Sequence, residues 1–458
     1  MEIIGVIKMD KSTFQLYQAQ FHSSQECAKA ISEMERQFKY TDEIEYFSNL
    51  VNFSTAKNAP YQRWVRYREG YSTALVDELI RRANISSDTH FVADPMVGSG
   101  STIVAAKRQG YDAFGIDVNP FCKTIVDAKM LQPTSNTMDY IRQFLQNLDT
   151  LEPVDEKIEI PLADYFPEGN LRVLVALKQR ILSVEHMEAK QILLACWYFI
   201  IEDCSDRKKD GNGLATRPAP VTDVVKYFSQ SMQELISDYI NHPFANDTSS
   251  AIFTGSACDF SSYSNAFASQ IGGKKLGAII FSPPYANSFD YFESYKMELL
   301  FGQLLSPDDY QTHKKKQIRN YRICYGKELH SEYPVVEMLC NEIREEIPEK
   351  EARTGKRDGR TRLMPNMLCG YFCDMGKVLK QLYEALDNGG SCYIVVDQSA
   401  YVGVIVPTDV ILADIAKDCG FKVEEIVVCR KANTSGQQLK AYPYLGQTLR
   451  ESIVCLKK

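Results

Sequence analysis

Residues 91–102 read Phe-Val-Ala-Asp-Pro-Met-Val-Gly-Ser-Gly-Ser-Thr, and this stretch decides the fold. The apolar run 91–93 predicts a short strand, and the glycines at 98 and 100 predict a tight turn. A helical pattern follows over 102–109, and 111–116 predicts a second strand that ends at Asp117. Strand, glycine turn, helix and strand make one βαβ unit, so we expect a parallel sheet covered by helices.

The same alternation returns further along the chain. Strand patterns occur at 251–255, 278–281, 391–396, 423–428 and 452–456, which brings the expected sheet to about seven strands. Helical patterns cover 25–38, 72–82, 171–181, 189–202, 221–240, 377–386 and 408–418. We therefore expect an N-terminal extension (1–58), a cofactor-binding half (59–130), a helical insertion (131–245), a catalytic part (246–300), a basic polar insertion (301–368) and a C-terminal part of the sheet domain (369–458).

Composition excludes several classes of protein. Of 458 residues, 45% are hydrophobic and 24% are charged, which excludes a disordered chain, a collagen and a coiled coil. The net charge is 52 − 59 = −7, which excludes a strongly basic nucleic-acid coat but leaves room for local basic patches. The 13 cysteines form no CxxC pair and the 6 histidines show no ligand spacing, so we expect reduced thiols and no catalytic metal.

No secretory signal pattern opens the sequence, and the longest apolar run, 192–201, is about half of a membrane span. We expect this run to be a buried helix and the protein to be cytoplasmic.

The glycine turn is suited to a ligand that carries a negative charge. Gly98 and Gly100 let the backbone approach a ligand closely, and the helix after them offers N–H groups to a carboxylate or phosphate. The spacing is not GxGxxG, and no Gly-Lys-Ser/Thr of a phosphate-binding loop follows. The same glycines also suit an ordinary turn between a strand and a helix.

Two carboxylates follow the next predicted strands. Asp117 can accept hydrogen bonds from two ribose hydroxyls, or it can cap the helix that begins near Pro120. Asp259 can accept from an adenine amine with the Phe260 ring beside it, or it can be an ordinary surface carboxylate.

Ser282-Pro-Pro-Tyr285 comes directly after the apolar strand pattern 278–281. The two prolines restrict the turn and lack N–H groups, so carbonyls are its main-chain partners. A hydroxyl, a carbonyl and an aromatic face then lie within one turn. Such a set can accept both protons of an exocyclic amine while Tyr285 stacks on the ring, although it also suits a plain turn that ends a strand.

Taken in order, these motifs resemble the amino-methylating DNA methyltransferases that use S-adenosylmethionine. The resemblance rests on Asp-Pro…Gly-Ser-Gly-Ser-Thr at 94–102, Gly-Ile-Asp-Val-Asn-Pro at 115–120 and the strand that ends in Ser-Pro-Pro-Tyr. Segments 63–72, 287–299 and 387–396 are also similar to that family. The resemblance implies a class I, Rossmann-like α/β methyltransferase fold with a largely helical insertion and a basic recognition segment.

The resemblance also implies roles for individual residues. Gly98 and Gly100 lie alongside the methionine part of S-adenosylmethionine. Asp117 binds the ribose, and Asp259 binds the adenine. Ser282, the carbonyl of Pro283 and Tyr285 hold the target base, with Pro284 completing the turn. The expected cofactor-binding residues are Tyr71, Ser72, Asp94, Pro95, Gly98, Ser99, Gly100, Ser101, Thr102, Asp117, Asn119, Asp259 and Phe260.

The family variant with serine at the first position of the tetrapeptide mostly methylates the N4 amine of cytosine, whereas aspartate or asparagine goes mostly with the N6 amine of adenine. We therefore expect cytosine-N4 methylation of double-stranded DNA, with adenine-N6 as the alternative. A base inside a duplex does not reach such a pocket, so we expect base flipping. The expected DNA contacts are Phe289, Tyr291, Lys208, Lys209, Lys314, Lys315, Lys316, Arg319, Arg357 and Arg360.

Other functions stay open from sequence. An RNA or protein amino-methyltransferase is one, and a non-catalytic S-adenosylmethionine-binding subunit of a modification or defence complex is another. Carbon-5 methylation is disfavoured because no cysteine sits in a Pro-Cys turn. The acidic surface leaves room for a restriction nuclease or defence-complex partner, and no membrane partner is expected.

Overall fold

A large twisted sheet forms the centre of the computed structural model, which describes residues 24–52, 57–67, 70–211, 213–244, 247–286, 289–320, 323–324, 329–432 and 436–458. The strand order is β1-β11-β12-β8-β7-β2-β3-β6 in this 8-stranded sheet. Neighbouring strands are parallel except for β12, which is antiparallel to both β8 and β11. The strands are β1 (Tyr40–Asp42), β2 (His90–Asp94), β3 (Ala113–Asp117), β6 (Ser250–Thr254), β7 (Lys275–Phe281), β8 (Ser391–Asp397), β11 (Lys422–Lys431) and β12 (Arg450–Lys457).

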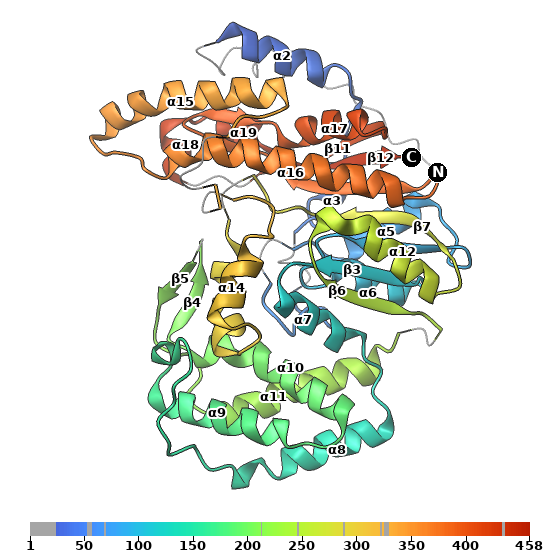
Figure 1. Ribbon diagram of the computed structural model, residues 1–458, viewed down its shortest axis with the longest axis vertical. Helices are drawn as coiled ribbons and strands as arrows, with labels where there is room; N and C mark the ends of the chain where they lie inside the picture. The colour runs from blue at the N-terminus through green and yellow to red at the C-terminus, as the bar shows by residue number, and fades with distance from the viewer. Residues whose placement is uncertain are drawn as a thin grey trace.

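Helices cover both faces of the sheet, and alternate residues of one strand face opposite layers. Phe91 and Ala93 of β2 pack with α12, α15, α16 and α17, whereas Val92 packs with α5 and α6. This arrangement confirms the expected Rossmann-like α/β methyltransferase fold (Figure 1). The covering helices are α2 (Gln25–Glu35), α3 (Ile44–Phe47), α5 (Thr73–Ala83), α6 (Ser101–Arg108), α7 (Pro120–Met130), α12 (Phe260–Gln270), α15 (Pro334–Thr354), α16 (Met364–Ala385) and α17 (Thr408–Asp418).

A separate lobe of helices lies below the sheet in Figure 1. It contains α8 (Ser135–Gln146), α9 (Glu168–Leu182), α10 (Met187–Cys204) and α11 (Val224–Asn241), which share their own apolar core. The apolar run 192–201 lies in α10 and is buried there, as expected. Among the described residues, no helix is both long enough and apolar enough to cross a membrane.

Several short elements complete the chain. The polar stretch after α10 forms a hairpin of β4 (Arg207–Asp210) and β5 (Gly213–Thr216), which the sequence analysis did not predict. A second hairpin joins β9 (Ser399–Tyr401) to β10 (Val404–Val406). The remaining helices are α13 (Tyr291–Ser294), α14 (Pro307–Lys314), α18 (Gly436–Ala441) and α19 (Leu445–Thr448).

The structure differs from the expected division of the chain at two places. Residues 40–42, within the expected extension, pair in parallel with Ile426–Val428 of β11 and so extend the sheet. The expected polar insertion contains α15, 21 residues long, whose Val336, Leu339 and Ile343 are buried in the same core as α16. The helix has many charged residues, and its apolar residues recur only at helical spacing along one face. The overall composition of the segment therefore indicated a polar insertion.

A buried carboxylate ties the helical lobe to the segment before the glycine turn. Asp238 of α11 is fully buried and accepts from the backbone N–H of Tyr61 (2.9 Å) and from Trp64 Nε1 (2.8 Å). Arg63 forms an ion pair with the same carboxylate. The chain that leads to Tyr67 and Tyr71 is therefore held in place from the lobe.

Candidate active site

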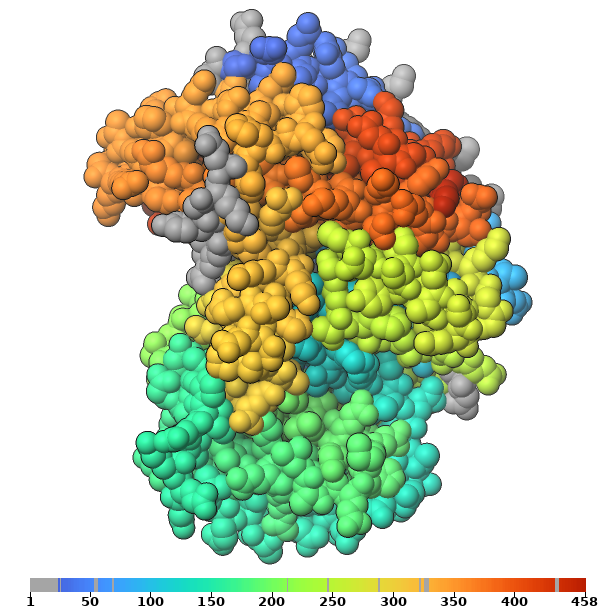
Figure 2. All heavy atoms as spheres, in the orientation of Figure 1, coloured from blue at the N-terminus to red at the C-terminus, as the bar shows by residue number. Residues whose placement is uncertain are grey.

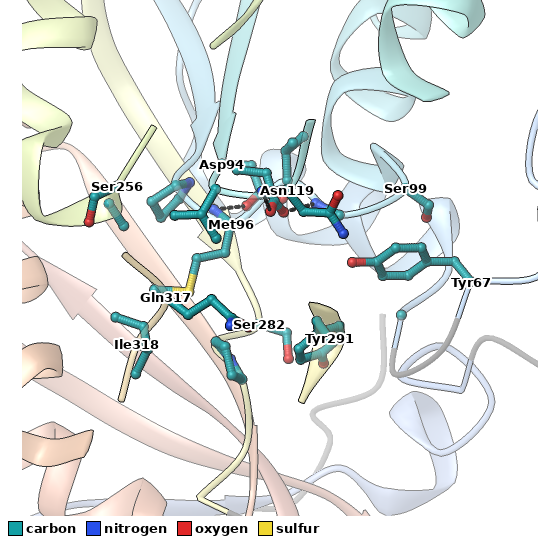
Figure 3. A pocket seen from close by; sticks show the side chains of 18 of the residues that line it. Tyr67, Asp94, Met96, Ser99, Asn119, Ser256, Ser282, Tyr291, Gln317 and Ile318 are labelled. Carbon is teal, nitrogen blue, oxygen red and sulfur yellow. Dashed lines mark hydrogen bonds between the residues drawn. The ribbon is translucent and has the colours of Figure 1, made fainter. Parts of the chain in front are cut away.

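The main cavity lies at the carboxyl ends of β2, β3, β6 and β7, where ligands bind in open parallel sheets. The space between its walls, open solvent included, is about 860 Å³. Figure 3 shows Asp94, Asn119 and Ser256 on one side, Ser282 and Tyr291 on another, and Gln317 between Met96 and Ser282. Both sequence motifs, the glycine turn and the Ser-Pro-Pro-Tyr turn, therefore contribute to one cavity.

The turn after β2 is fixed from inside by Asp94. Its Oδ1 accepts from the backbone N–H of Met96 (2.9 Å), and its Oδ2 accepts from the Tyr71 hydroxyl (3.0 Å). The Tyr71 hydroxyl also lies 2.7 Å from Thr102 Oγ1. Burial raises the pKa of Asp94 to about 7. Asp94 and Tyr71 line the cavity, whereas Thr102 is fully buried behind them.

The glycines are required by the backbone and by close packing. Gly98 has φ of 49° and Gly100 has φ of 85°, in the left-handed region that favours glycine. A Cβ at Gly98 would lie 2.9 Å from the Tyr67 ring, and one at Gly100 would lie 2.7 Å from Val126. Gly98 lines the cavity with Ser99 and Ser101, and Gly100 precedes α6. The N-terminus of α6 therefore opens at the cavity.

Lys129 of α7 holds this turn from behind. Its ammonium is fully buried and donates to the carbonyl of Ser99 (2.7 Å), and burial lowers its pKa to about 7.

Asp117 lies at the end of β3 and lines the cavity. Its carboxylate accepts from the backbone N–H groups of Gly98 (3.1 Å) and Asn119 (2.9 Å). Burial raises its pKa. A carboxylate has about four acceptor positions, so two hydrogen bonds leave capacity for a ligand.

Asn119 lines the same cavity with an unused donor. Its Oδ1 accepts from the backbone N–H of Phe121 (3.0 Å) and caps α7. Its Nδ2 is buried and has no hydrogen-bond partner among the described residues. A cradle of glycines, an acidic group and an unpaired amide fit a ligand with a carboxylate and a ribose, which is the chemistry of S-adenosylmethionine.

Five of the expected cofactor residues do not line the cavity: Ser72, Gly100, Thr102, Asp259 and Phe260. Asp259 is exposed at the start of α12, and Phe260 is fully buried beside Phe114, 5.2 Å between ring centroids. Gly255, Ser256 and Ala257 form the cavity wall at this position instead. Asp259 and Phe260 lie outside the cavity wall because the chain after β6 starts a short helical turn (Ala257–Asp259), and their expected role toward the adenine stays a prediction. Ser72 instead caps α5 by accepting from the backbone N–H of Leu75 (3.2 Å).

The Ser-Pro-Pro-Tyr turn is held in place by side chains of β12 and β11. Ser282 and Pro284 line the cavity, and Pro283 is buried. The Tyr285 hydroxyl donates to Glu451 Oε1 (3.1 Å) on β12, and Arg430 pairs with the other oxygen of that carboxylate. Burial raises the pKa of Glu451. These contacts fix Tyr285 before any substrate binds.

A smaller hollow adjoins the main cavity and shares Pro284, Tyr291, Gln317 and Ile318 with it. We call it the aromatic hollow, since its walls are mostly rings and apolar side chains. Its remaining lining residues are Tyr285, Phe289, Arg319, Asn320, Met367 and Tyr371. Phe289 and Tyr291 pack edge to face, 4.7 Å between ring centroids.

The expected DNA-binding lysines divide into exposed and buried ones. Lys209 is buried in ion pairs with Glu202 and Glu298, and Lys314 is buried in ion pairs with Asp290 and Glu293. Neither ammonium is on the surface, so the expectation that they contact DNA is corrected. The exposed residues of the set are Lys208, Lys315, Lys316, Arg357 and Arg360. The further basic residues Arg322 and Lys327 lie outside the described residues.

Arg319 also has a structural partner. Its guanidinium donates to both carboxylate oxygens of Asp374 on α16, at 2.9 and 2.7 Å, and its backbone N–H donates to the same group (3.0 Å). The hydrogen bonds raise the pKa of Arg319. The expected phosphate contact is therefore replaced by an ion pair that holds one wall of the aromatic hollow. In Figure 2 the amber residues around 310 lie at the surface between the helical lobe and the helices above it.

Sequence reasoning missed several lining residues. Tyr67 covers Gly98 and stacks on Tyr295, 5.3 Å between centroids, but an aromatic residue in an irregular segment gave no signal. Gln317 and Ile318 lie in a segment noticed only for its charge. The residues described contain no group of three or more His, Cys, Asp or Glu side chains that could hold a metal ion.

Comparisons with known proteins agree with this geometry. The chain is 26% identical over 448 residues to the Type II methyltransferase M.AvaI of Nostoc sp., covering 89% of each chain. It is 26% identical over 501 residues to the Type II methyltransferase M.BsoBI of Geobacillus stearothermophilus, covering 96% of this chain and 95% of the relative. The chain is thus related to Type II methyltransferases over nearly its whole length. No family model matches it.

Among solved structures, the rRNA methyltransferase aviRa from Streptomyces viridochromogenes covers 84% of this chain and 85% of its own, with 10% identity and a TM-score of 0.27. An overlap that low supports no argument about this chain.

Proposed function

We propose that this protein is a site-specific DNA methyltransferase that transfers a methyl group from S-adenosylmethionine to the exocyclic N4 amine of cytosine. One observation carries the proposal: Asp117, at the end of β3, and Ser282, the first residue of the Ser-Pro-Pro-Tyr turn, line the same cavity. The relatedness to Type II methyltransferases over almost the full chain supports it.

The main cavity is the proposed cofactor site. The turn at Gly98 and the N-terminus of α6 accept the carboxylate of the methionine part. Asp117 accepts from the ribose hydroxyls. Asn119 supplies its unpaired Nδ2 donor, and Ser256 takes the position expected for Asp259. When bound, S-adenosylmethionine supplies an electrophilic methyl group on a sulfonium.

The Ser-Pro-Pro-Tyr turn is the proposed site for the target amine. The lone pair of such an amine is delocalised into the ring, so the amine is a poor nucleophile. Ser282 Oγ and the Pro283 carbonyl accept its two N–H groups and turn the lone pair toward the main cavity, while Tyr285 stacks on the ring. Positioning and fixed dipoles supply much of the rate, and no covalent bond to the protein is required.

The aromatic hollow beside this turn is the proposed place of the flipped base. The net charge of −7 offers no general attraction to DNA. Binding therefore depends on local groups of exposed lysines and arginines, which contact the phosphates. Lys208 lies on the β4–β5 hairpin, and Lys315 and Lys316 follow α14. Lys316 also lines the main cavity, so this group of cations adjoins the proposed reaction site.

The proposal is tested by methyl transfer to mixed-sequence duplex DNA. The protein is incubated with labelled S-adenosylmethionine, the DNA is digested to nucleosides, and N4-methylcytosine is separated from N6-methyladenine by mass. We expect methylcytosine, formed about 100-fold more slowly by Ser282→Ala. Methyladenine would keep the site and overturn the cytosine assignment; label on RNA or protein alone, or cofactor binding without transfer, would overturn the DNA substrate.

A further inference from the structure

The aromatic hollow contains a polar group that the proposed reaction does not yet use. Tyr371 of α16 lines the hollow and is only 1% exposed. Its hydroxyl is buried and has no hydrogen-bond partner among the described residues. A buried donor without a partner destabilises a protein, so such a group is retained where a ligand completes its hydrogen bond. Burial raises the pKa of Tyr371 above its ordinary value, so the hydroxyl keeps its proton.

The position of Tyr371 is fixed by its neighbours on α16. Asp374, three residues further along the helix, accepts three hydrogen bonds from Arg319. Gly370 lets the same segment approach: a Cβ there would lie 3.0 Å from Cys324 Sγ and 3.1 Å from Arg319 Cβ. The wall that carries Tyr371 and the wall at 317–320 are therefore clamped together, and a donor held in this way loses little freedom when a ligand binds.

The chemistry of the hollow selects the kind of ligand. Its aromatic side chains offer faces on which a planar ring can stack, and Pro284 and Tyr291 also line the main cavity together with Ser282. A ring with its exocyclic amine at Ser282 presents its next ring atom deeper in the hollow. In cytosine and in adenine that ring atom is a nitrogen acceptor. A hydroxyl donor at this place can therefore hydrogen-bond with either base.

We propose that the Tyr371 hydroxyl donates a hydrogen bond to the ring nitrogen beside the exocyclic amine of the flipped base and so helps to hold that base. The assignment rests on the proposed function. It makes Tyr371 a contact to the substrate, separate from the cofactor side and from the Ser-Pro-Pro-Tyr turn.

The test is Tyr371→Phe, which removes only the hydroxyl. Because that hydroxyl has no hydrogen-bond partner within the described part of the chain, we expect a melting temperature equal to or above that of the parent. We expect the Kd for S-adenosylmethionine to stay within about twofold, and kcat/KM for duplex DNA to fall about tenfold, the value of one hydrogen bond.

Tyr111→Phe is the matched control, since the Tyr111 hydroxyl donates to the carbonyl of Ile85 (2.8 Å), among residues that do not line either cavity. It should lower the melting temperature and leave kcat/KM unchanged. If Tyr371→Phe behaves like this control, the hydroxyl is structural and the assignment is overturned. An active parent with unchanged kcat/KM in Tyr371→Phe overturns the assignment alone, whereas a parent inactive on every duplex overturns the proposed function and the assignment with it.

Discussion

The two sides of the main cavity are built in different ways. The cofactor side comes mainly from residues 94–101 and 117–119, which lie close together in sequence. They follow β2 and β3, which are adjacent strands of the sheet. The base side joins residues 282–285, 317–320 and 367–371, which meet only in the fold. Backbone hydrogen bonds fix the first side, as at Asp117, and side-chain ion pairs fix the second, as at Arg319 and Asp374. Changes on the first side should therefore act on ligand affinity, and changes on the second on stability and shape.

The largest expected effect separates Asp117 from Asp259. Asp117→Ala removes an acceptor that lines the cavity and carries two backbone hydrogen bonds, so we expect the Kd for S-adenosylmethionine to rise about 100-fold or more. Asp259→Ala removes an exposed carboxylate outside the cavity and should change this Kd less than about twofold. Isothermal titration of both variants measures the difference. Equal losses would show that the cofactor reaches Asp259 and that the cavity is assigned wrongly.

On the base side we expect a smaller effect, on the stability of the protein and not on cofactor affinity. Arg319→Gln removes the two-oxygen ion pair of Asp374 and leaves only its longer pair with Lys377 (3.9 Å), so we expect the free energy of unfolding to fall by about 2 kcal/mol. Lys315→Gln is the matched control, because Lys315 is exposed on the same segment. The control should keep the stability of the parent and weaken DNA binding, reducing the salt slope by about one phosphate contact. Urea unfolding measures the stability, and DNA titrations at several salt concentrations measure the salt slope. If Arg319→Gln keeps the stability and weakens DNA binding, Arg319 contacts DNA and the assignment of a structural role is wrong.

The pH dependence of stability tests the buried carboxyl of Asp94 on the cofactor side. The pKa of Asp94 is about 7 in the folded protein, above the unfolded value of about 3.9. The folded state therefore binds more protons between these values, and stability falls as pH rises from about 4 to about 7. Asp94→Asn has no such proton, so its stability should fall less steeply, by up to about 1.4 kcal/mol per pH unit in this window. Denaturant unfolding from pH 4 to 8 measures the two slopes; parallel slopes would contradict the burial of this carboxyl.

The same contrast explains how much could be predicted from sequence. The strands at 91–93 and 111–116 and the helix after Gly100 were found because their patterns are local. The three-residue strand β1 was missed because its pairing with β11 is the only reason for its conformation. The place of Asp259 outside the cavity wall could not be predicted, since it depends on a single helical turn after β6.

Charge runs were misleading for a similar reason. Lys208 and Lys209 are neighbours on one strand, so they face opposite sides, one exposed and the other buried against Glu298. Lys314 and Lys315 differ in the same way at the end of α14. Glu298 and Asp290, the partners that bury Lys209 and Lys314, come from distant parts of the sequence, so a run of lysines does not reveal which member is structural.

The central claim is that one cavity holds the cofactor at Asp117 and presents the amine at Ser282. The most direct measurement is the rate of methyl transfer to duplex DNA at rising S-adenosylmethionine concentration for Asp117→Ala and Ser282→Ala. We expect Asp117→Ala to approach the parent rate at saturating cofactor. Ser282→Ala should keep the parent's half-saturating concentration and remain about 100-fold slower. A Ser282→Ala protein that transfers methyl groups at the parent rate would contradict the account.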